Sequence, residues 1–490
     1  MLIAASKKES AASLPQAGSL RLGARFLPPS TIYVLETMRI NPNWTAQRSG
    51  HDWRDDELML AVAWLKSFVP RIQMERRLDA AKERLLEARK QMREGLQVPF
   101  FDPSDVAAWY ILQAETFAYD RAYWTPEGAM RIAPYLTRIG KELPLLLSVK
   151  NVEERAARIM LAERRQPDGG IYELLVGLAY RRGGWTDVEF VQEKRGLERT
   201  PDLHVSRPRS HWAVECKRLA VSSYATKENQ RGIVLAEKAH ALLLEQYQSL
   251  VVEVVYKVEL EDVPDEYLVG GVQAAMERAS TESVEDEIAA IRVRPVNWEL
   301  TRSVLREDYV YYGSTRMIEL LAGSYAHDAN HSMAAKWRPW EDRPEYADAV
   351  YQASVVTWRS ASAAATRQKA RHFKKTLVDA NGQLPGDRPG VIHIGIETYA
   401  GARVDAFRHV RNSLQSRYFD PGKSRLRWVY GNYFVPEATT RQDESWAFTE
   451  TMVPYRVGSH RTKWPLPDHM LVSPEGKSFS GMHWDGRDFH

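Results

Sequence analysis

The chain has 490 residues, of which 44% are hydrophobic and 27% are charged, and its formal net charge at pH 7 is +3. This composition is ordinary for a globular, soluble protein, and the length allows two or three domains. So small a net charge argues neither for nor against nucleic-acid binding, so any basic surface must be local. The single cysteine, Cys216, excludes an intrachain disulfide and a Cys-rich zinc site.

No apolar run in the sequence approaches the length that a membrane-spanning helix needs. The first residues lack a basic segment followed by an apolar one, which a secretory signal peptide would have. A lone cysteine also suits a reducing compartment. We therefore expect a cytoplasmic protein that does not interact with membranes.

The N-terminal third of the chain has a helical pattern. Residues 1–30 are rich in Ala, Ser and Gly and are expected to be poorly ordered, whereas residues 31–164 are expected to form a helical domain. Within it, Asp55 or Asp56 can cap a helix that ends before Pro70. This domain is the expected surface for a protein partner or for target selection.

The helix expected over about residues 71–94 carries an apolar heptad seam. The seam consists of Met74, Leu78, Ala81, Leu85, Ala88 and Met92. Such a seam can pack against a neighbouring helix of the same chain or form a short coiled coil between two copies. We favour packing within the chain, while a homodimer stays an alternative.

From residue 165 to about residue 440, helix and strand patterns alternate, which predicts an α/β domain. Its first helix, about 171–182, ends at Gly183-Gly184 in the manner of a C-cap. Three strands are expected next, at residues 187–192, 199–206 and 211–219. They are followed by a long helix at 229–248, a strand at 251–260 and a helix at 264–278.

Residues 280–348 are poorly patterned and are expected to be an insertion. The elements after it are a strand at 349–358, a basic helix containing Arg367 to Lys375, a buried strand at 391–396, a helix at 404–414 and a strand at 427–435. We expect these to be further layers of the same sheet. Residues 441–490, rich in Pro, Trp and His, are expected to be an irregular tail.

The strand 211–219 carries the residues with the clearest chemistry. Side chains alternate along a strand, so Glu215 and Lys217 project from one face and Cys216 from the other, toward the core. If the strand expected at residues 199–206 is adjacent, Asp202 brings another carboxylate to the same edge. Two carboxylates beside one ammonium form a site for a divalent metal, because hard cations favour oxygen ligands.

Pro201-Asp202 followed by Glu215-Cys216-Lys217, after a helix that contains Glu173, resembles the signature of the PD-(D/E)XK nuclease superfamily. The resemblance covers about residues 171–260. The triplet alone is weak evidence, since Glu475-Gly476-Lys477 repeats it, and the order of helix and strands carries the comparison. It implies a restriction-endonuclease-like mixed sheet flanked by helices.

The resemblance also implies roles for individual residues. Asp202 and Glu215 would hold Mg²⁺ or Mn²⁺, with the backbone carbonyl of Cys216 and the carboxylate of Glu173 as further ligands. Lys217 would position the attacking water, and Gln230 would lie against the active site. The implied activity is that of a DNA endonuclease in restriction, repair or phage defence, and many relatives act as dimers.

Other interpretations account for the same residues. Glu215 and Lys217 can form an ion pair on a solvated sheet face, and Glu173 can complement a helix dipole. The chain as a whole could be a catalytically inactive nuclease-like fold that binds nucleic acid or assembles a complex, or an α/β enzyme of other chemistry. The basic groups are phosphate contacts or solvated surface: Arg181, Arg182, Arg207, Arg209 and the run from Arg367 to Lys375.

Overall fold

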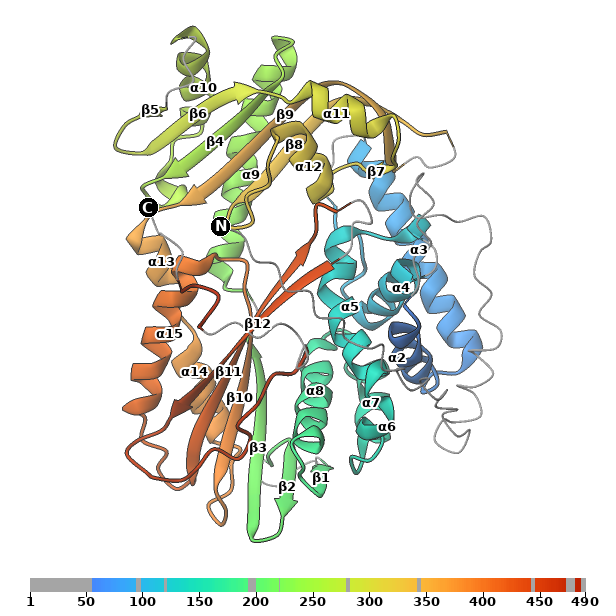
Figure 1. Ribbon diagram of the computed structural model, residues 1–490, viewed down its shortest axis with the longest axis vertical. Coiled ribbons are helices and arrows are strands. Elements are labelled where there is room, and N and C mark those ends of the chain that lie inside the picture. Colours follow the sequence, from blue (N-terminus) through green and yellow to red (C-terminus); the bar gives the residue numbers. More distant parts are fainter. Residues whose placement is uncertain are drawn as a thin grey trace, which may run out of the picture.

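The computed structural model describes residues 55–93, 98–118, 121–192, 200–219, 221–278, 283–341, 345–441, 446–472 and 481–485. Within them the chain forms a helical N-terminal segment and two mixed β-sheets of six strands each (Figure 1). The expectation of a mixed α/β protein with helices at the front is therefore confirmed. The expected disorder of residues 1–30 falls outside the described residues.

The N-terminal segment consists of helices that pack around one apolar core. They are α2 (Asp56–Lys66), α3 (Arg71–Arg93), α4 (Val106–Ala118), the short 3-10 helix η1 (Arg121–Tyr123), α5 (Pro126–Lys141), α6 (Leu143–Leu146), α7 (Val152–Met160) and α8 (Asp168–Arg182). Asp55 caps α2 as predicted, because its Oδ1 accepts a hydrogen bond from Leu58 N at 2.7 Å.

The heptad seam of α3 faces this core. Met74, Leu78 and Leu85 are buried in the same apolar cluster as α4, whereas Leu86 is 49% exposed. These seam residues therefore pack within the chain, which is the interpretation favoured above.

The first sheet has the strand order β1-β2-β3-β10-β11-β12. Its strands are β1 (Asp187–Phe190), β2 (Leu203–Arg207), β3 (Ser210–Leu219), β10 (Gly390–Glu397), β11 (Leu426–Ala438) and β12 (Trp446–Arg456). β3, β10 and β11 run parallel, and the other pairings are antiparallel. Every residue of β10 is buried, as expected for a central strand.

Helices cover both faces of the first sheet (Figure 1). Val214 and Cys216 of β3 belong to the core that α8 and the N-terminal helices share. Ala213, on the opposite face, packs against α14 (Phe373–Asn381), and α15 (Ala402–Arg417) lies alongside α14. The helices α13 (Ala363–Lys369) and α14 replace the single basic helix expected here, with a break at His372, whose φ is +89°.

The second sheet has the strand order β5-β6-β4-β9-β7. The sixth strand, β8, also pairs with β9 but lies outside this order. Its strands are β4 (Leu250–Tyr256), β5 (Val284–Glu285), β6 (Ala289–Pro295), β7 (Val310–Tyr311), β8 (Asn330–Pro339) and β9 (Tyr346–Ser360). α9 (Ser223–Glu245) and α10 (Tyr267–Arg278) cover one face; α11 (Trp298–Leu305) and α12 (Thr315–Ala322) pack on the other. The 3-10 helix η2 (Leu260–Asp262) follows β4.

The division between the two sheets corrects the expectation of one continuous sheet. β4, predicted to follow β3 in the nuclease-like sheet, pairs instead with β6 and β9 in the second sheet. β10 takes the place beside β3, with α14 before it. The second sheet thus draws its strands from residues 250–360, a longer segment than the insertion predicted at 280–348.

The C-terminal segment is also more regular than predicted. Within residues 441–490, β12 forms the edge of the first sheet and tolerates Pro454 there, because an edge strand has a free side. Leu466, Leu471 and Val472 then enter the core of the N-terminal helices. The described part of this segment is therefore a strand and a packed strap, not an irregular tail.

None of the helices described here is both long enough and apolar enough to span a lipid bilayer.

Candidate metal-binding and catalytic site

The pairing of β2 with β3 brings the predicted motif residues together. Leu203 lies opposite Val214 and His204 opposite Ala213, which places Asp202 just beyond the ladder and beside Glu215. Asp202 Oδ2 accepts a hydrogen bond from the backbone N–H of Cys216 at 2.6 Å. The carboxylate is thus held against β3 and directed toward the residues on either side of Cys216.

Glu215 is a charged residue with no exposed surface. Its Oε1 is paired with the ammonium of Lys217, whose side chain is 29% exposed. Its Oε2 is buried and has no hydrogen-bond partner among the described residues. A hydrogen bond between the Glu215 and Asp202 side chains nevertheless lowers the pKa of Glu215, so the two carboxyl groups share one buried space.

Burial dominates the electrostatics of the two carboxyl groups. It raises the pKa of Asp202 well above its usual range, and the nearby Glu173 and Glu215 raise it further. Burial also raises the pKa of Glu215 to about 7, although Lys217 partly offsets the shift. For Lys217, burial lowers the pKa, but the Glu215 carboxylate outweighs it, so the pKa is raised and the ammonium keeps its charge.

Glu173 lies on α8, close enough to raise the pKa of both carboxyl groups. Its own two oxygens are occupied by Arg155, at 2.5 Å from Nε and 2.9 Å from Nη2. Arg155 also pairs with Glu163 at 2.7 Å. Each oxygen of Glu173 thus accepts one hydrogen bond from Arg155 and keeps a second lone pair.

Gln230 does not join the carboxylates in the described structure. It lies on α9 and lines a separate cavity beyond the end of β3. The thiol of Cys216 is buried on the opposite face of β3, and burial raises its pKa well above the usual range. Cys216 contacts this site through its backbone N–H, which donates to Asp202 Oδ2.

The arrangement fits a divalent cation that keeps several waters. Within the described ranges, no three His, Cys, Asp or Glu side chains converge as a complete metal-binding cluster. Mg²⁺ needs no such cluster, since one or two carboxylates suffice when waters and substrate oxygens complete its shell. Asp202 and Glu215 could supply these carboxylates, and because burial raises the pKa of each, a bound cation would compete with protons for them.

A basic helix packs on the same face of β3 as Glu215 and Lys217. Phe373 and Leu377 of α14 are buried against Ala213, which shares the parity of Glu215 along the strand. Lys374 and Lys375 on the other side of α14 are exposed. By contrast, Arg181, Arg182 and Arg207 are engaged within the chain by carbonyls, by Glu142 and by the ring of Trp185.

Sequence reasoning missed an ionic network that begins one residue after the motif. Arg218 is paired with Glu397 at the end of β10, and Arg131 of α5 joins them at 2.8 Å from Glu397 Oε1. Burial raises the pKa of Glu397, but the two guanidinium groups outweigh it and the pKa is lowered. The one signal in the sequence was the position of Arg218 directly after Lys217.

Comparison of the chain with models of protein families, with curated proteins and with solved structures gave no match. Any functional assignment therefore depends on the residues themselves and on their geometry.

Proposed function

We propose that this chain is a metal-dependent nuclease that hydrolyses phosphodiester bonds, with DNA as its substrate and internal cutting as its mode of action. The observation that carries the proposal is one cluster: the carboxyls of Asp202 and Glu215 on neighbouring strands, with the Lys217 ammonium beside them. Burial and the nearby Glu173 raise the pKa of both carboxyl groups, and a cation held between them would relieve this.

Each residue would have a separate task. Asp202 and Glu215 would hold Mg²⁺ or Mn²⁺, with the Cys216 carbonyl as a further oxygen. The bound ion would supply an activated water and neutralise charge on the phosphate. Lys217, charged and partly exposed, would position that water and offset charge on the phosphate group.

The order of elements also supports the proposal. If the second sheet is set aside as an insertion, the first sheet and its helices follow a simple order. The helix α8 precedes three antiparallel strands (β1, β2, β3), and the helix α14 precedes β10, which is parallel to β3. The exposed lysines of α14 lie on the motif side of β3, where they could contact the phosphate backbone.

The test is incubation of the purified protein with plasmid, linear and single-stranded DNA in the presence of Mg²⁺ or Mn²⁺. We expect cleavage that a chelator abolishes and that Lys217→Ala reduces about 100-fold or more, as for loss of a group that stabilises transition-state charge. Lys150→Ala is the matched control, since Lys150 is an exposed lysine paired with Asp187 outside the site.

Undiminished cleavage by Lys217→Ala would refute the role given to this residue. A second candidate is a catalytically inactive nuclease-like fold that binds nucleic acid, and one observation favours it: Lys217 and Glu173 are both held in ion pairs. In that case we expect DNA binding that survives chelation, without any cleavage.

A further inference from the structure

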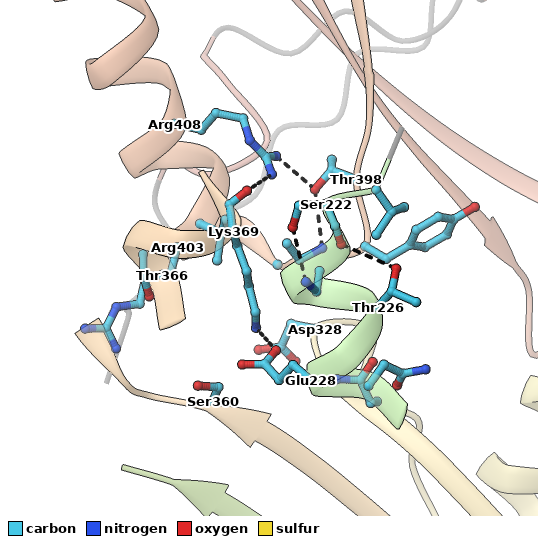
Figure 2. Close-up of a pocket in the computed structure, with 18 of the residues that line it drawn as sticks. Ser222, Thr226, Glu228, Asp328, Ser360, Thr366, Lys369, Thr398, Arg403 and Arg408 are labelled. Atoms are coloured by element: carbon cyan, nitrogen blue, oxygen red, sulfur yellow. Dashed lines mark hydrogen bonds and ion pairs between the residues drawn. The ribbon is translucent and has the colours of Figure 1, made fainter. Parts of the chain in front are cut away.

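A cavity of about 680 Å³ lies between the two sheets (Figure 2). Its wall includes the carboxyl ends of β3 and β10 from the first sheet and of β4 and β9 from the second, at Leu219, Glu397, Val255 and Ser360. In open α/β sheets, ligands bind outside the carboxyl ends of parallel strands. The volume is in the range of small-molecule sites.

One side of the cavity suits an anion. α15, sixteen residues long, begins there after Gly401, whose φ is +86°, and no side chain caps its first turn. The N–H groups at the start of a helix attract phosphate; here those of Val404 and Asp405 already donate to Gly401 O, which leaves those of Ala402 and Arg403 for an anion. Arg403 of this first turn and Arg371, between α13 and α14, are exposed, and both line the cavity.

The acidic groups of the wall are mostly neutralised within the protein. Asp328 is paired with Arg359 at 2.8 Å, and Glu397 is paired with Arg131 and Arg218. These two carboxylates are therefore paired with other arginines and do not neutralise Arg403 or Arg371.

Glu228 is the exception, because it offers a free acceptor. It is 8% exposed and lines the cavity, and its Oε2 is paired with the ammonium of Lys369 (Figure 2). Its Oε1 is buried and has no hydrogen-bond partner among the described residues. A ligand that donates a hydrogen bond would satisfy it.

An aromatic ring completes the lining. Tyr399 is 46% exposed, and its hydroxyl donates to Glu397 Oε1 at 2.8 Å. The hydroxyl bond anchors the ring while part of its surface stays open. A planar heterocycle can stack on such a ring.

We propose that this cavity binds a nucleotide. Its phosphate would lie at the start of α15 beside Arg403 and Arg371, its base would stack on Tyr399, and an exocyclic amino group of the base would donate to Glu228 Oε1. The inference does not rest on the proposed nuclease activity, because it concerns different residues and needs no divalent ion. The nucleotide could be free or part of a nucleic-acid strand.

The test is calorimetric titration of the full chain in the presence of a chelator. The chelator prevents metal-dependent cleavage, so absence of nucleotide binding would overturn this proposal without bearing on the nuclease assignment. The probes are the four ribonucleoside and four deoxyribonucleoside monophosphates, the matching nucleosides and inorganic phosphate. We expect saturable binding of at least one nucleotide, tighter than binding of its nucleoside or of phosphate. Arg403→Glu and Arg371→Glu should each weaken it tenfold or more, whereas Arg76→Glu, the same charge reversal at an exposed arginine of α3, should not.

Glu228→Gln should weaken binding of the preferred nucleotide and leave inorganic phosphate unaffected. The proposal is overturned if no nucleotide binds at millimolar concentration, if phosphate alone binds as tightly as nucleotides, or if the arginine variants bind normally. Displacement of a labelled mononucleotide separates the two sources. A single-stranded oligonucleotide that displaces it more effectively than the free nucleotide indicates a strand; weaker displacement indicates a free nucleotide.

Discussion

Glu215 lies in surroundings that disfavour the charged form of its side chain. Its carboxyl group is fully buried, and burial raises its pKa to about 7 from an ordinary value of 4.5. Between these two values the folded protein binds the proton more tightly than the unfolded chain does. This group's contribution to the free energy of unfolding therefore decreases as the pH rises through that window.

We predict that Glu215→Gln removes this dependence. In chelator, the melting temperature of the wild type relative to that of the variant should fall between about pH 5 and pH 8. Comparison with the variant is needed because buried His393 and His469 have lowered pKa values and contribute the opposite slope in both proteins. Thermal melts in a pH series measure the difference.

Addition of Mg²⁺ or Mn²⁺ at pH 8 should then stabilise the wild type more than Glu215→Gln, because the ion would replace the displaced proton. A pH-independent difference between the two proteins would contradict the assigned environment of Glu215. Equal stabilisation by the ion would contradict its role as a ligand.

The alternation of side chains along one strand was enough to predict that Glu215 and Lys217 share a face, and the turn between two short strands predicted that Asp202 lies beside them. The engagement of Glu173 by Arg155 was not predictable, because the two residues are on different helices and only tertiary packing decides their partners. The position of Gln230 was not predictable for a related reason: α9 leaves the first sheet and packs against the second, so Gln230 lines the cavity between them.

At the scale of single elements, α3 offers a comparison between two adjacent leucines. Leu85 is fully buried against the N-terminal core, whereas Leu86 is 49% exposed. We predict that Leu85→Ala lowers the free energy of unfolding by about 2–5 kcal/mol and Leu86→Ala by less than about 0.5 kcal/mol. Denaturant unfolding measures both values. A larger loss of unfolding free energy for Leu86→Ala than for Leu85→Ala would contradict the packing of the seam against the N-terminal core.

Most helices and strands were predictable from local patterns, but their pairing was not. The apolar runs of β4 and β10 are of the same kind, so the sequence gives no local sign that β10, and not β4, pairs with β3. β12 was missed because its segment is rich in Pro, Trp and His, and a proline such as Pro454 is unfavourable in an interior strand. The sheet order shows that β12 is an edge strand, where a proline is tolerated.

At the scale of the whole molecule, the C-terminal strap connects the first sheet to the N-terminal helices. Glu450 of β12 accepts hydrogen bonds at 2.9 Å from the backbone N–H groups of Leu471 and Val472. Val472 O in turn accepts one from Arg138 Nε on α5 at 2.8 Å, and Trp185 Nε1 donates to Pro465 O. One buried carboxylate thus holds a segment that links two layers.

We predict that Glu450→Ala destabilises the protein by about 3 kcal/mol or more, since it leaves buried N–H groups unpaired. It should also open the strap to proteolysis between residues 457 and 472. Asp468→Ala is the control: Asp468 is exposed and accepts a hydrogen bond from the N–H of Met470, so this substitution should cost less than about 1 kcal/mol. Unchanged protease resistance in Glu450→Ala would contradict the role of this carboxylate.

The cavity between the sheets was beyond prediction because its lining comes from segments between residues 219 and 408 that meet only after both sheets have formed. Sequence reasoning could identify Gln230 and the basic run from Arg367 as unusual, but not that they surround one space.

The pairing of β3 with β10 has a consequence for biosynthesis. Roughly 170 residues separate the two strands, and at ordinary rates of translation the ribosome needs on the order of ten seconds or more to make them. Throughout that interval one edge of β3 has no partner, while the intervening sheet can already fold from its own strands. The nascent chain would thus complete its insertion before the strand that bears Glu215 and Lys217 is enclosed, and this unpaired edge is where a chaperone would be needed.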